Sequence, residues 1–223
     1  MFFSRYSFAF ILMLKFGTDA FPRKFFATTV TGLESVLEHE LSGTCGAKNT
    51  MIGKNGVHFE GDDTTALKAV MYCRTSLRIM ENLLQSDSKI SSKDDLYSLV
   101  SSIDWQNYLL PDSTLKCDAI IGRAVAADLS HTHFSSLTVK NAIVDQFRDK
   151  TGFRPSVDLD DPYLPLLLYL HRGQATLYRV WSGELSMHKR GYRDVIHKAA
   201  LRETTAAALL LMVAFELKIE YAT

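Results

Sequence analysis

The sequence has few of the residues that build disulfide or metal frameworks. Its three cysteines, Cys45, Cys73 and Cys117, are odd in number, widely spaced and outside any C-x-x-C pattern. This pattern argues against a disulfide framework and a cysteine-rich zinc site, and it fits a reducing compartment. The 12 glycines never take the spacing of a dinucleotide-binding or phosphate-binding loop, so no nucleotide site of those kinds is expected.

Net charge and long apolar runs are missing as well. Lysine plus arginine and aspartate plus glutamate number 25 each, so attraction to nucleic acid must come from a local patch. The longest uncharged apolar runs, residues 8–14 and 206–215, are shorter than the roughly 18 residues that a membrane-spanning helix needs. We expect an intracellular protein without a membrane span, and cytoplasm, mitochondrion and chloroplast stay open. The basic residues 1–23 are either a targeting segment or a mobile extension.

The first half of the chain alternates strand and helix signals. Aromatic and β-branched residues at 24–30 predict a strand, and Thr31 with Glu34 matches a helix capping box. Asn55-Gly56 predicts a type I′ hairpin turn, and Asp62 caps a second helix before a strand at 76–84. The order β-α-β-β-α-β is that of the ferredoxin-like fold. The expected inward residues of the two helices are Leu33, Val36, Leu37, Glu40 and Leu41, then Leu67, Val70, Met71 and Arg74.

The second half predicts the order α-α-β-α-β-β, followed by a last helix from about Lys198, so the fold class is α+β with two small domains. Gly152 ends the longest helix, whose expected inward residues are Val139, Ile143, Val144 and Phe147. Arg172-Gly173 joins the last two strands. The segments are helices at 92–103, 104–109 and 136–150 and strands at 114–121, 164–170 and 175–181.

No constellation for catalysis or metal binding stands out. His131 and His133 alternate in a segment expected to be extended, but they lack a third ligand nearby, so loop packing explains them better than a metal. Asp94-Asp95 and Asp160-Asp161 lie beside serine or proline, where turns and helix caps explain them better than acid–base chemistry. We expect no catalytic residue and no metal site in this chain.

The strongest chemical signal is a cationic stretch from His171 to Arg202. It holds seven lysines and arginines against two acids in a chain whose total charge is 0. Cations interleaved with an aromatic ring can contact phosphates and stack on a base. A solvated face or an interdomain seam is the alternative. The set of Lys140, Arg148, Lys150 and Arg154 is offset by Asp145 and Asp149 and fits a salt-bridged surface better. The predicted RNA contacts are Lys189, Arg190 and Arg193, with Tyr192 stacking and a rim of Lys140, Arg154, Arg172 and Arg202.

Several short motifs follow one another in an order that resembles a known family. They are Phe25-Phe26-Ala27-Thr28-Thr29, Gly32-Leu33-Glu34, Gly56-Val57-His58-Phe59, Ser76-Leu77-Arg78-Ile79-Met80, Ile103-Asp104-Trp105, Val139-Lys140-Asn141-Ala142-Ile143-Val144-Asp145, Arg154-Pro155-Ser156-Val157-Asp158 and His188-Lys189-Arg190-Gly191-Tyr192-Arg193. Over residues 24–210 the chain resembles the bacterial large-subunit ribosomal RNA guanine-N2 methyltransferases that carry a THUMP domain.

The resemblance implies a ferredoxin-like domain at 24–86 and a THUMP-like RNA-binding domain at 87–184, after an extension at 1–23. Residues 185–223 would be a linker and the truncated start of a Rossmann-like domain, which in the family binds S-adenosylmethionine and methylates guanine. The glycine-rich cofactor loop and the [DN]-P-P-[YFW] motif of that domain are absent from this chain. The chain alone is therefore predicted to bind no cofactor and to be inactive.

Two functions stay open. The first is the RNA-binding part of such a methyltransferase, with large-subunit ribosomal RNA as partner. The alternative is a non-catalytic interaction or regulatory fragment that does not bind RNA and self-associates through the apolar face of its last helix. An enzyme complete in this chain would need a cofactor site that the sequence does not show.

Overall fold

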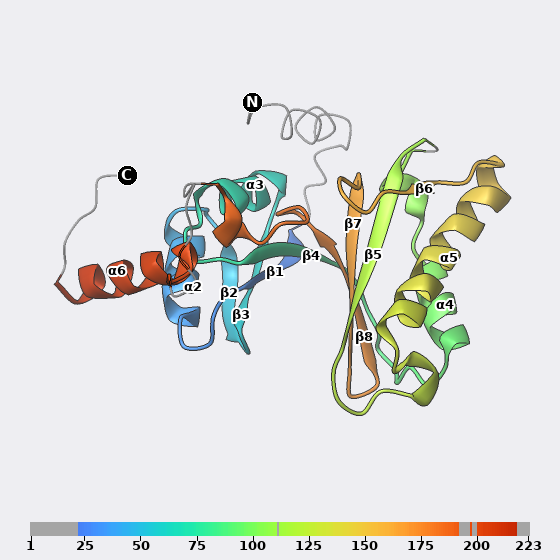
Figure 1. The fold of residues 1–223 in the computed structure, drawn as a ribbon, viewed down its shortest axis with the longest axis horizontal. Helices are drawn as coiled ribbons and strands as arrows, with labels where there is room; N and C mark the ends of the chain where they lie inside the picture. The colour runs from blue at the N-terminus through green and yellow to red at the C-terminus, as the bar shows by residue number, and fades with distance from the viewer. Residues whose placement is uncertain (1–21, 111, 192–196, 198–199, 218–223) are drawn as a thin grey trace. The chain divides into compact units, whose positions relative to one another are not determined.

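The computed structural model describes residues 22–110, 112–191, 197 and 200–217, and it divides the chain into two compact units (Figure 1). Among the described residues, the central unit contains residues 82–180, and the flanking unit contains those before 82 and after 180 in the sequence. Within the described part of the chain, no helix has the length and apolar character needed to cross a membrane.

The flanking unit has the predicted β-α-β-β-α-β order. Its strands lie in the order β2-β3-β1-β4, and each neighbouring pair is antiparallel. This is the ferredoxin-like arrangement, so that prediction is confirmed. The elements are β1 (Arg23–Thr28), α2 (Glu34–Gly43), β2 (Lys48–Gly53), β3 (Gly56–Gly61), α3 (Asp63–Tyr72) and β4 (Arg78–Gln85).

The core of the flanking unit lies between its sheet and its two helices. Phe25 on β1 and Phe59 on β3 are 1% exposed and stack with ring centroids 5.2 Å apart. The predicted N-cap of α3 is confirmed, because Asp62 accepts a hydrogen bond from the N–H of Thr65 at 2.8 Å. The predicted inward face of α2 is also confirmed by the burial of Leu33, Val36, Leu37, Glu40 and Leu41.

The predicted inward face of α3 is wrong. The helix buries Ala66 and Ala69, whereas Met71 is 63% exposed. The short distance between α3 and β3 explains the difference. Even a Cβ on Gly61 of β3 would lie only 2.6 Å from the side chain of Thr65 on the helix. Helix and sheet are too close at this point for large side chains. The other predicted residues are the half-buried Leu67 and Val70 and the exposed Arg74.

The predicted capping box at Thr31 and the predicted type I′ turn at Asn55-Gly56 both differ in the structure. Thr31 does not cap α2, since its Oγ1 donates to Oδ1 of Asn55 at 2.7 Å, and only Glu34 reaches back to a backbone N–H. The hairpin is present, but Asn55 alone has positive φ, 60°, and Gly56 already belongs to β3, so the type I′ assignment is wrong. Glycine is required at position 56 because a Cβ would lie 2.3 Å from the carbonyl oxygen of Ala27.

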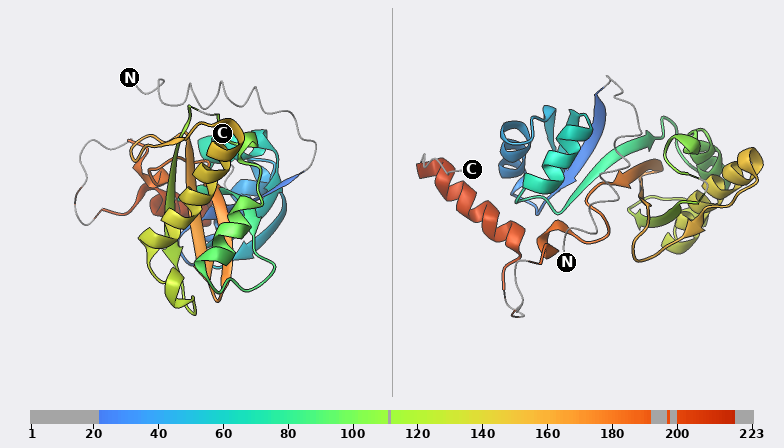
Figure 2. Two further views of the ribbon diagram at one scale, coloured as in Figure 1. Left: turned by 90° about the vertical axis from the view of Figure 1, so that its right-hand side faces the viewer. Right: turned by 90° about the horizontal axis from the view of Figure 1, so that it is seen from above.

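The central unit is a sheet with two helices on one face (Figures 1 and 2). Its strand order is β8-β7-β5-β6, in which β5 pairs in parallel with β7 and β7 pairs antiparallel with β8. The strand at 114–121 is confirmed, the long helix begins four residues earlier than predicted, and the two-residue β6 was missed. The elements are α4 (Lys93–Ser101), β5 (Thr114–Ile121), α5 (Thr132–Thr151), β6 (Ser156–Val157), β7 (Leu164–His171) and β8 (Gln174–Val180), with 3-10 turns η1 (Trp105–Asn107) and η2 (Ala127–Leu129).

The core of the central unit joins α4, α5 and the sheet. Trp105 is fully buried, and its indole N–H donates to the carbonyl oxygen of Val100 at 3.0 Å. Gln146 of α5 accepts from the N–H of Trp105 at 2.9 Å, which ties the helix to η1. Gly152 has φ 73° and ends α5 as predicted. The predicted inward residues of α5 are all buried, namely Val139, Ile143, Val144 and Phe147.

The chain returns to the flanking unit after β8. A 3-10 turn, η3 (Met187–Lys189), precedes the last helix, α6 (Glu203–Leu217). The helix begins later than predicted, and Lys198 lies outside the described residues. Ala208 and Leu211 of α6 pack with Leu33 and Val36, so this helix covers part of α2.

A buried carboxylate connects α2 to the segment between α3 and β4. Glu40 is 3% exposed and accepts from Nε of Arg74 at 2.9 Å, from the N–H of Thr75 at 3.0 Å and from the Thr75 hydroxyl at 2.6 Å. The two donors of Thr75 need this acceptor because Thr75 is 1% exposed and water does not reach them. Glu40 therefore fixes the path by which the chain enters β4.

We expect Glu40→Ala to lower the free energy of unfolding by about 3 kcal/mol, because it leaves the buried hydroxyl and backbone N–H of Thr75 without an acceptor. Urea denaturation followed by circular dichroism measures the loss. Glu38→Ala is the matched control, since the side chain of Glu38 on the same helix accepts one hydrogen bond, from Thr50. An equal loss in both variants would contradict the special role of Glu40.

Candidate nucleic-acid interface

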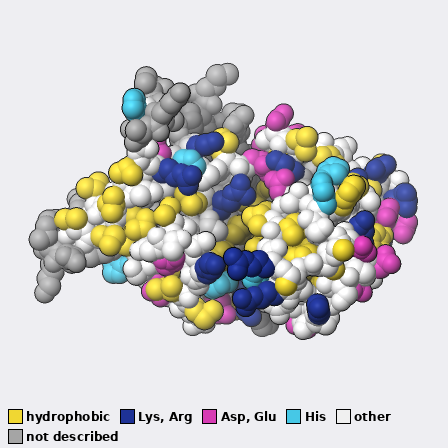
Figure 3. Space-filling view, turned by 60° about the horizontal axis from the view of Figure 1, so that its bottom comes forward, with side chains coloured by type: hydrophobic (Ala, Val, Ile, Leu, Met, Phe, Trp, Pro, Cys, Tyr) yellow, Lys and Arg dark blue, Asp and Glu magenta, His cyan; other side chains and the backbone are white. Residues whose placement is uncertain are grey.

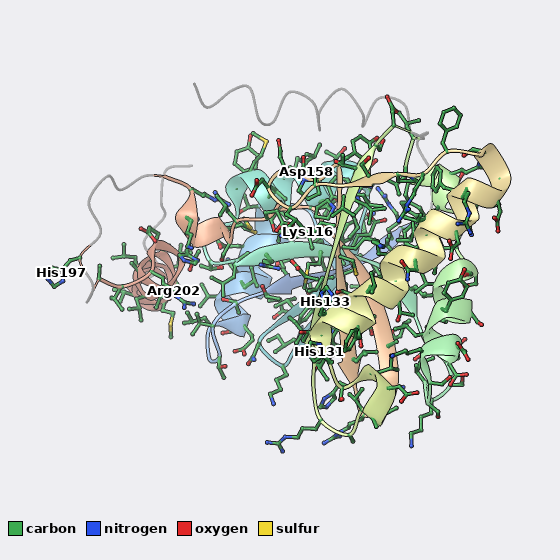
Figure 4. All side chains as sticks on the ribbon, turned by 45° about the vertical axis from the view of Figure 1, so that its right-hand side comes forward. Lys116, His131, His133, Asp158, His197 and Arg202 are labelled. Atoms are coloured by element: carbon green, nitrogen blue, oxygen red, sulfur yellow. The ribbon has the colours of Figure 1, made fainter. Side chains whose placement is uncertain are left out.

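The residues predicted to contact RNA fall in both units. The flanking unit contains Lys189 and Arg202, and Figure 4 labels Arg202. Burial lowers the pKa of His188, and the charges of Arg202 and Lys189 lower it further while Glu203 raises it. The central unit contains Lys140, Arg154 and Arg172, whereas Tyr192 and Arg193 lie outside the described residues.

The three predicted residues of the central unit do not form one cluster. Arg172 lies in the turn between β7 and β8, Lys140 lies on α5, and Arg154 follows the end of α5 at Gly152. The start of α5 and the end of β7 lie at the same end of the unit, and a helix of 20 residues spans roughly 30 Å. Arg154 is therefore remote from Arg172.

Arg190, predicted as a leading phosphate contact, has a structural role in the fold. Its Nη1 donates to the carbonyl oxygen of Met71 at 3.1 Å, and its Nη2 donates to those of Val70 and Cys73 at 2.7 and 2.9 Å. These carbonyls end α3 and have no partner within the helix. The guanidinium therefore caps the negative end of α3.

Three exposed cations meet at one end of the central unit. Arg123 follows β5, Arg172 follows β7, and Lys89 precedes α4. The N–H of Arg172 donates to the carbonyl oxygen of Arg123 at 2.8 Å, and the side chain of Lys89 lies against Gly173. Among the described residues, none of the three forms an ion pair. Lys89, Arg123 and Arg172 are termed the basic end below.

The tight turn between β7 and β8 positions the basic end. Arg172 and Gly173 both have positive φ, 52° and 75°, as the two central residues of a type I′ turn require. The carbonyl oxygen of Gly173 accepts from the N–H of Ile90 at 2.7 Å, which holds the segment of Lys89 beside the turn. Three segments far apart in sequence are thereby fixed by backbone hydrogen bonds.

The start of α5 lies at this end of the unit (Figure 1), and an exposed aromatic ring follows in its first turn. Phe134 is 51% exposed, and Nζ of Lys93 lies 5.3 Å from its ring centroid. His131 precedes the helix and His133 lies in its first turn, so the predicted extended segment is wrong. No group of three potential metal ligands occurs in the described parts of the chain. The first turn of α5 has neither a side-chain cap nor an acid, and its N–H groups leave a positive potential there.

Two cations of the predicted salt-bridged set, Arg148 and Lys150, are paired with acids. Arg148 lies 3.1 Å from a carboxylate oxygen of Asp145, and Lys150 lies 2.8 Å from one of Asp104. On the face of the molecule drawn in Figure 3, several Lys and Arg side chains lie next to one another instead of alternating with acids. Charge is therefore distributed unevenly over the surface.

The paired acids that the sequence singled out are caps and turns, as predicted. The N–H groups of Ser91 and Ser92 donate to Asp95 and lower the pKa of its carboxyl. Asp158 accepts from the N–H groups of Asp160 and Asp161, which lower its pKa in the same way. These carboxylates bind backbone, so they are not placed for acid–base chemistry.

A groove of about 540 Å³ lies between α5 and the edge of β5. β6 pairs with Thr114 and Leu115, and no other strand in the described part of the chain covers the rest of that edge of β5. Lys116 and His133 (Figure 4) line the groove together with Lys140 and the apolar side chain of Leu137. Lys116 also donates to the carbonyl oxygen of Leu159 at 3.2 Å. The groove is thus amphipathic, with two lysines in its walls.

Family models match both units in sequence. Residues 24–80 match the RlmL ferredoxin-like domain, and residues 91–180 match the THUMP domain. The fold and these matches define a protein with a ferredoxin-like domain of the RlmL type followed by a THUMP domain.

Two relatives show more closely which proteins of this class the chain is similar to. The "Ribosomal RNA large subunit methyltransferase K/L" of Syntrophotalea carbinolica is 36% identical over 190 residues, which are 85% of this chain and 26% of that protein. The Synechocystis protein slr0064 is 36% identical over 194 residues, 87% of this chain and 49% of that protein. The chain is homologous to the N-terminal region of the K/L methyltransferases, and it spans between a quarter and a half of these relatives.

Solved structures show the same fold. A Listeria monocytogenes protein described as a predicted N6-adenine-specific DNA methylase superimposes with a TM-score of 0.72 and 23% identity. The match covers 86% of this chain and 49% of that one. At this identity the likeness supports the arrangement of strands and helices.

The sequence analysis missed Lys89, Arg123 and Phe134. A high density of cations along the sequence does not point to these residues, because each is a single position in a separate segment. The carboxyl ends of parallel strands meet at one edge of a sheet, so the positions directly after the strands at 114–121 and 164–170 were the available signal. Arg123 and Arg172 occupy those positions.

We expect Arg190→Ala to lower the free energy of unfolding by about 2 kcal/mol, because the last carbonyls of α3 lose a charged donor. Lys189→Ala is the control, since this exposed neighbour should stay within about 0.5 kcal/mol of the native chain. Urea denaturation of the three proteins compares them, and equal midpoints would contradict the capping role.

Proposed function

We propose that the central unit binds RNA and that the basic end contacts its phosphates. The observation that carries this proposal is the meeting of three exposed cations, without ion pairs in the described part of the chain, on three separate segments. Like charges so placed repel one another, and phosphodiester groups relieve that repulsion. The start of α5 adds N–H groups that suit an anion and the ring of Phe134, on which a base can stack.

The relatives favour the same proposal. The THUMP match covers residues 91–180, which include Arg123, Phe134 and Arg172. The name of the K/L relative refers to large-subunit ribosomal RNA, which we propose as the RNA class. Methyl transfer from S-adenosylmethionine belongs, in this proposal, to the part of the relatives that this chain does not match. The ferredoxin-like and THUMP regions of this chain hold the RNA in this proposal.

The remaining predicted contacts form a wider surface in this proposal. Lys140 and Lys116 extend the contact along the groove beside β5, away from the basic end. Arg154 contributes at the far end of α5 and Arg190 contributes only to stability. The contacts of the flanking unit are Lys189, Arg202, Tyr192 and Arg193.

We expect Arg123→Gln combined with Arg172→Asn to weaken RNA binding at least tenfold. The slope of log Kd against log salt should fall by about 0.7 for each phosphate that the variant no longer neutralises. Asparagine suits position 172 because it tolerates the positive φ of the turn. Fluorescence anisotropy with a labelled single-stranded RNA of mixed sequence, over a potassium chloride series, measures both quantities.

The matched control is Lys48→Gln with Lys68→Gln, which removes two exposed lysines from the flanking unit. This control should leave Kd within twofold of the native value. Native affinity and native salt dependence in a folded Arg123/Arg172 variant would contradict the proposed interface.

A specific observation also favours self-association as a second function. While Ala208 and Leu211 pack on α2, α6 exposes Leu209, Met212 and Val213 by 46%, 41% and 55%. An apolar face of this kind is typical of a contact surface. We infer that α6 pairs with α6 of a second copy when RNA is absent.

Leu209→Glu with Val213→Glu is expected to convert a self-associating chain into a monomer, because two carboxylates then line one helix face. Sedimentation velocity over a concentration series measures the change, with Glu38→Gln as a control outside α6. A native chain that is monomeric at every concentration would contradict self-association and leave the RNA proposal standing.

A further inference from the structure

Two cysteines that the sequence places 28 positions apart lie side by side in the flanking unit. The Sγ atoms of Cys45 and Cys73 are 3.6 Å apart, and both residues are 1% exposed. Cys45 follows the end of α2 and Cys73 caps the end of α3, so the pair joins the carboxyl ends of the two helices. The spacing of the cysteines had argued against a disulfide, but the fold brings these two thiols together.

Glu40 and Arg190 fix the backbone around the cysteine pair. Glu40 binds the two residues after Cys73, and Arg190 donates to the carbonyl oxygen of Cys73 at 2.9 Å. The backbone on both sides of Cys73 is thereby held, which keeps its thiol facing Cys45. Cys117 lies in the central unit and has no thiol neighbour in the described chain.

The two thiols differ in acidity. The hydrogen bond with Cys73 lowers the pKa of Cys45, whereas the same bond and burial raise the pKa of Cys73 well above its usual value. A thiolate is the reactive form of cysteine, so Cys45 is the better nucleophile of the two.

We propose that Cys45 and Cys73 are a thiol modification site at which a hydroperoxide produces an intramolecular disulfide. The Cys45 thiolate attacks one peroxide oxygen, the O–O bond breaks, and a sulfenic acid and one water (or alcohol) form after protonation. The Cys73 thiol then loses its proton and attacks the Cys45 sulfur, and the S–O bond breaks with release of a second water. The two sulfurs are oxidised by two electrons in total and the peroxide is reduced. A dithiol reverses the reaction by exchange.

Burial selects among oxidants. A peroxide is small enough to reach the pair during local opening, whereas a bulky aromatic disulfide reagent is excluded from thiols that are 1% exposed. The product cross-links the ends of α2 and α3. It removes freedom from the unfolded chain, so the oxidised protein unfolds at a higher denaturant concentration.

Peroxide treatment of the full chain under native conditions tests the proposal. The protein is exposed to hydrogen peroxide, quenched with catalase, denatured, alkylated with iodoacetamide and digested. Mass spectrometry should find a peptide pair joined through Cys45 and Cys73, lighter by two hydrogens than the separate peptides, and dithiothreitol should restore both alkylation sites. The urea midpoint of the oxidised chain should rise and return after reduction.

Cys117→Ser is the matched control, because it removes the remaining cysteine and should leave the cross-link unchanged. Cys45→Ser and Cys73→Ser should each abolish it. The cross-link is measured in the native chain, so the proposal can still be tested if a cysteine variant fails to fold. Oxidation that stops at sulfinic acid without a cross-link, or cross-links only between separate chains, would overturn the proposal.

Discussion

The parallel pairing of β5 with β7 is the constraint on which the candidate interface depends. Seven consecutive residue pairs set the two strands in register, so both carboxyl ends lie at the same end of the sheet. A parallel pair needs a long crossover, here supplied mainly by α5, and the crossover helix must start at that same end. Arg123, Arg172 and the first turn of α5 are therefore brought together by topology, although they are far apart in sequence.

In the flanking unit two charged groups, Glu40 and Arg190, stabilise the fold. Glu40 and Arg190 bind the chain on either side of Cys73, one through side-chain and backbone donors and the other through carbonyls. Both act where a helix end leaves backbone groups without partners. The cationic stretch that looked most like a phosphate site thus includes a residue whose donors are used internally. Charge density along a sequence does not distinguish these two uses.

The sequence predicted well what depends on local pattern and poorly what depends on distant neighbours. The strand at 114–121, the buried face of α5 and its end at Gly152 follow from periodicity and glycine chemistry, and all were confirmed. The inward face of α3 was wrong because the close approach at Gly61 admits only small side chains. Lys89 and the Cys45–Cys73 pair were invisible because only the folded chain brings their partners near.

Arg172 adopts a backbone conformation that is energetically unfavourable for a residue with a side chain. A residue with a Cβ at positive φ costs roughly 1 kcal/mol relative to glycine, and asparagine would fit this turn better than arginine. In the described chain the side chain of Arg172 gains no ion pair that would offset this cost. Arg148 and Lys150, on ordinary helical backbone, are paired with acids instead. A residue that breaks a local rule without a structural gain is expected at a binding surface, which agrees with our proposal that Arg172 contacts a phosphate.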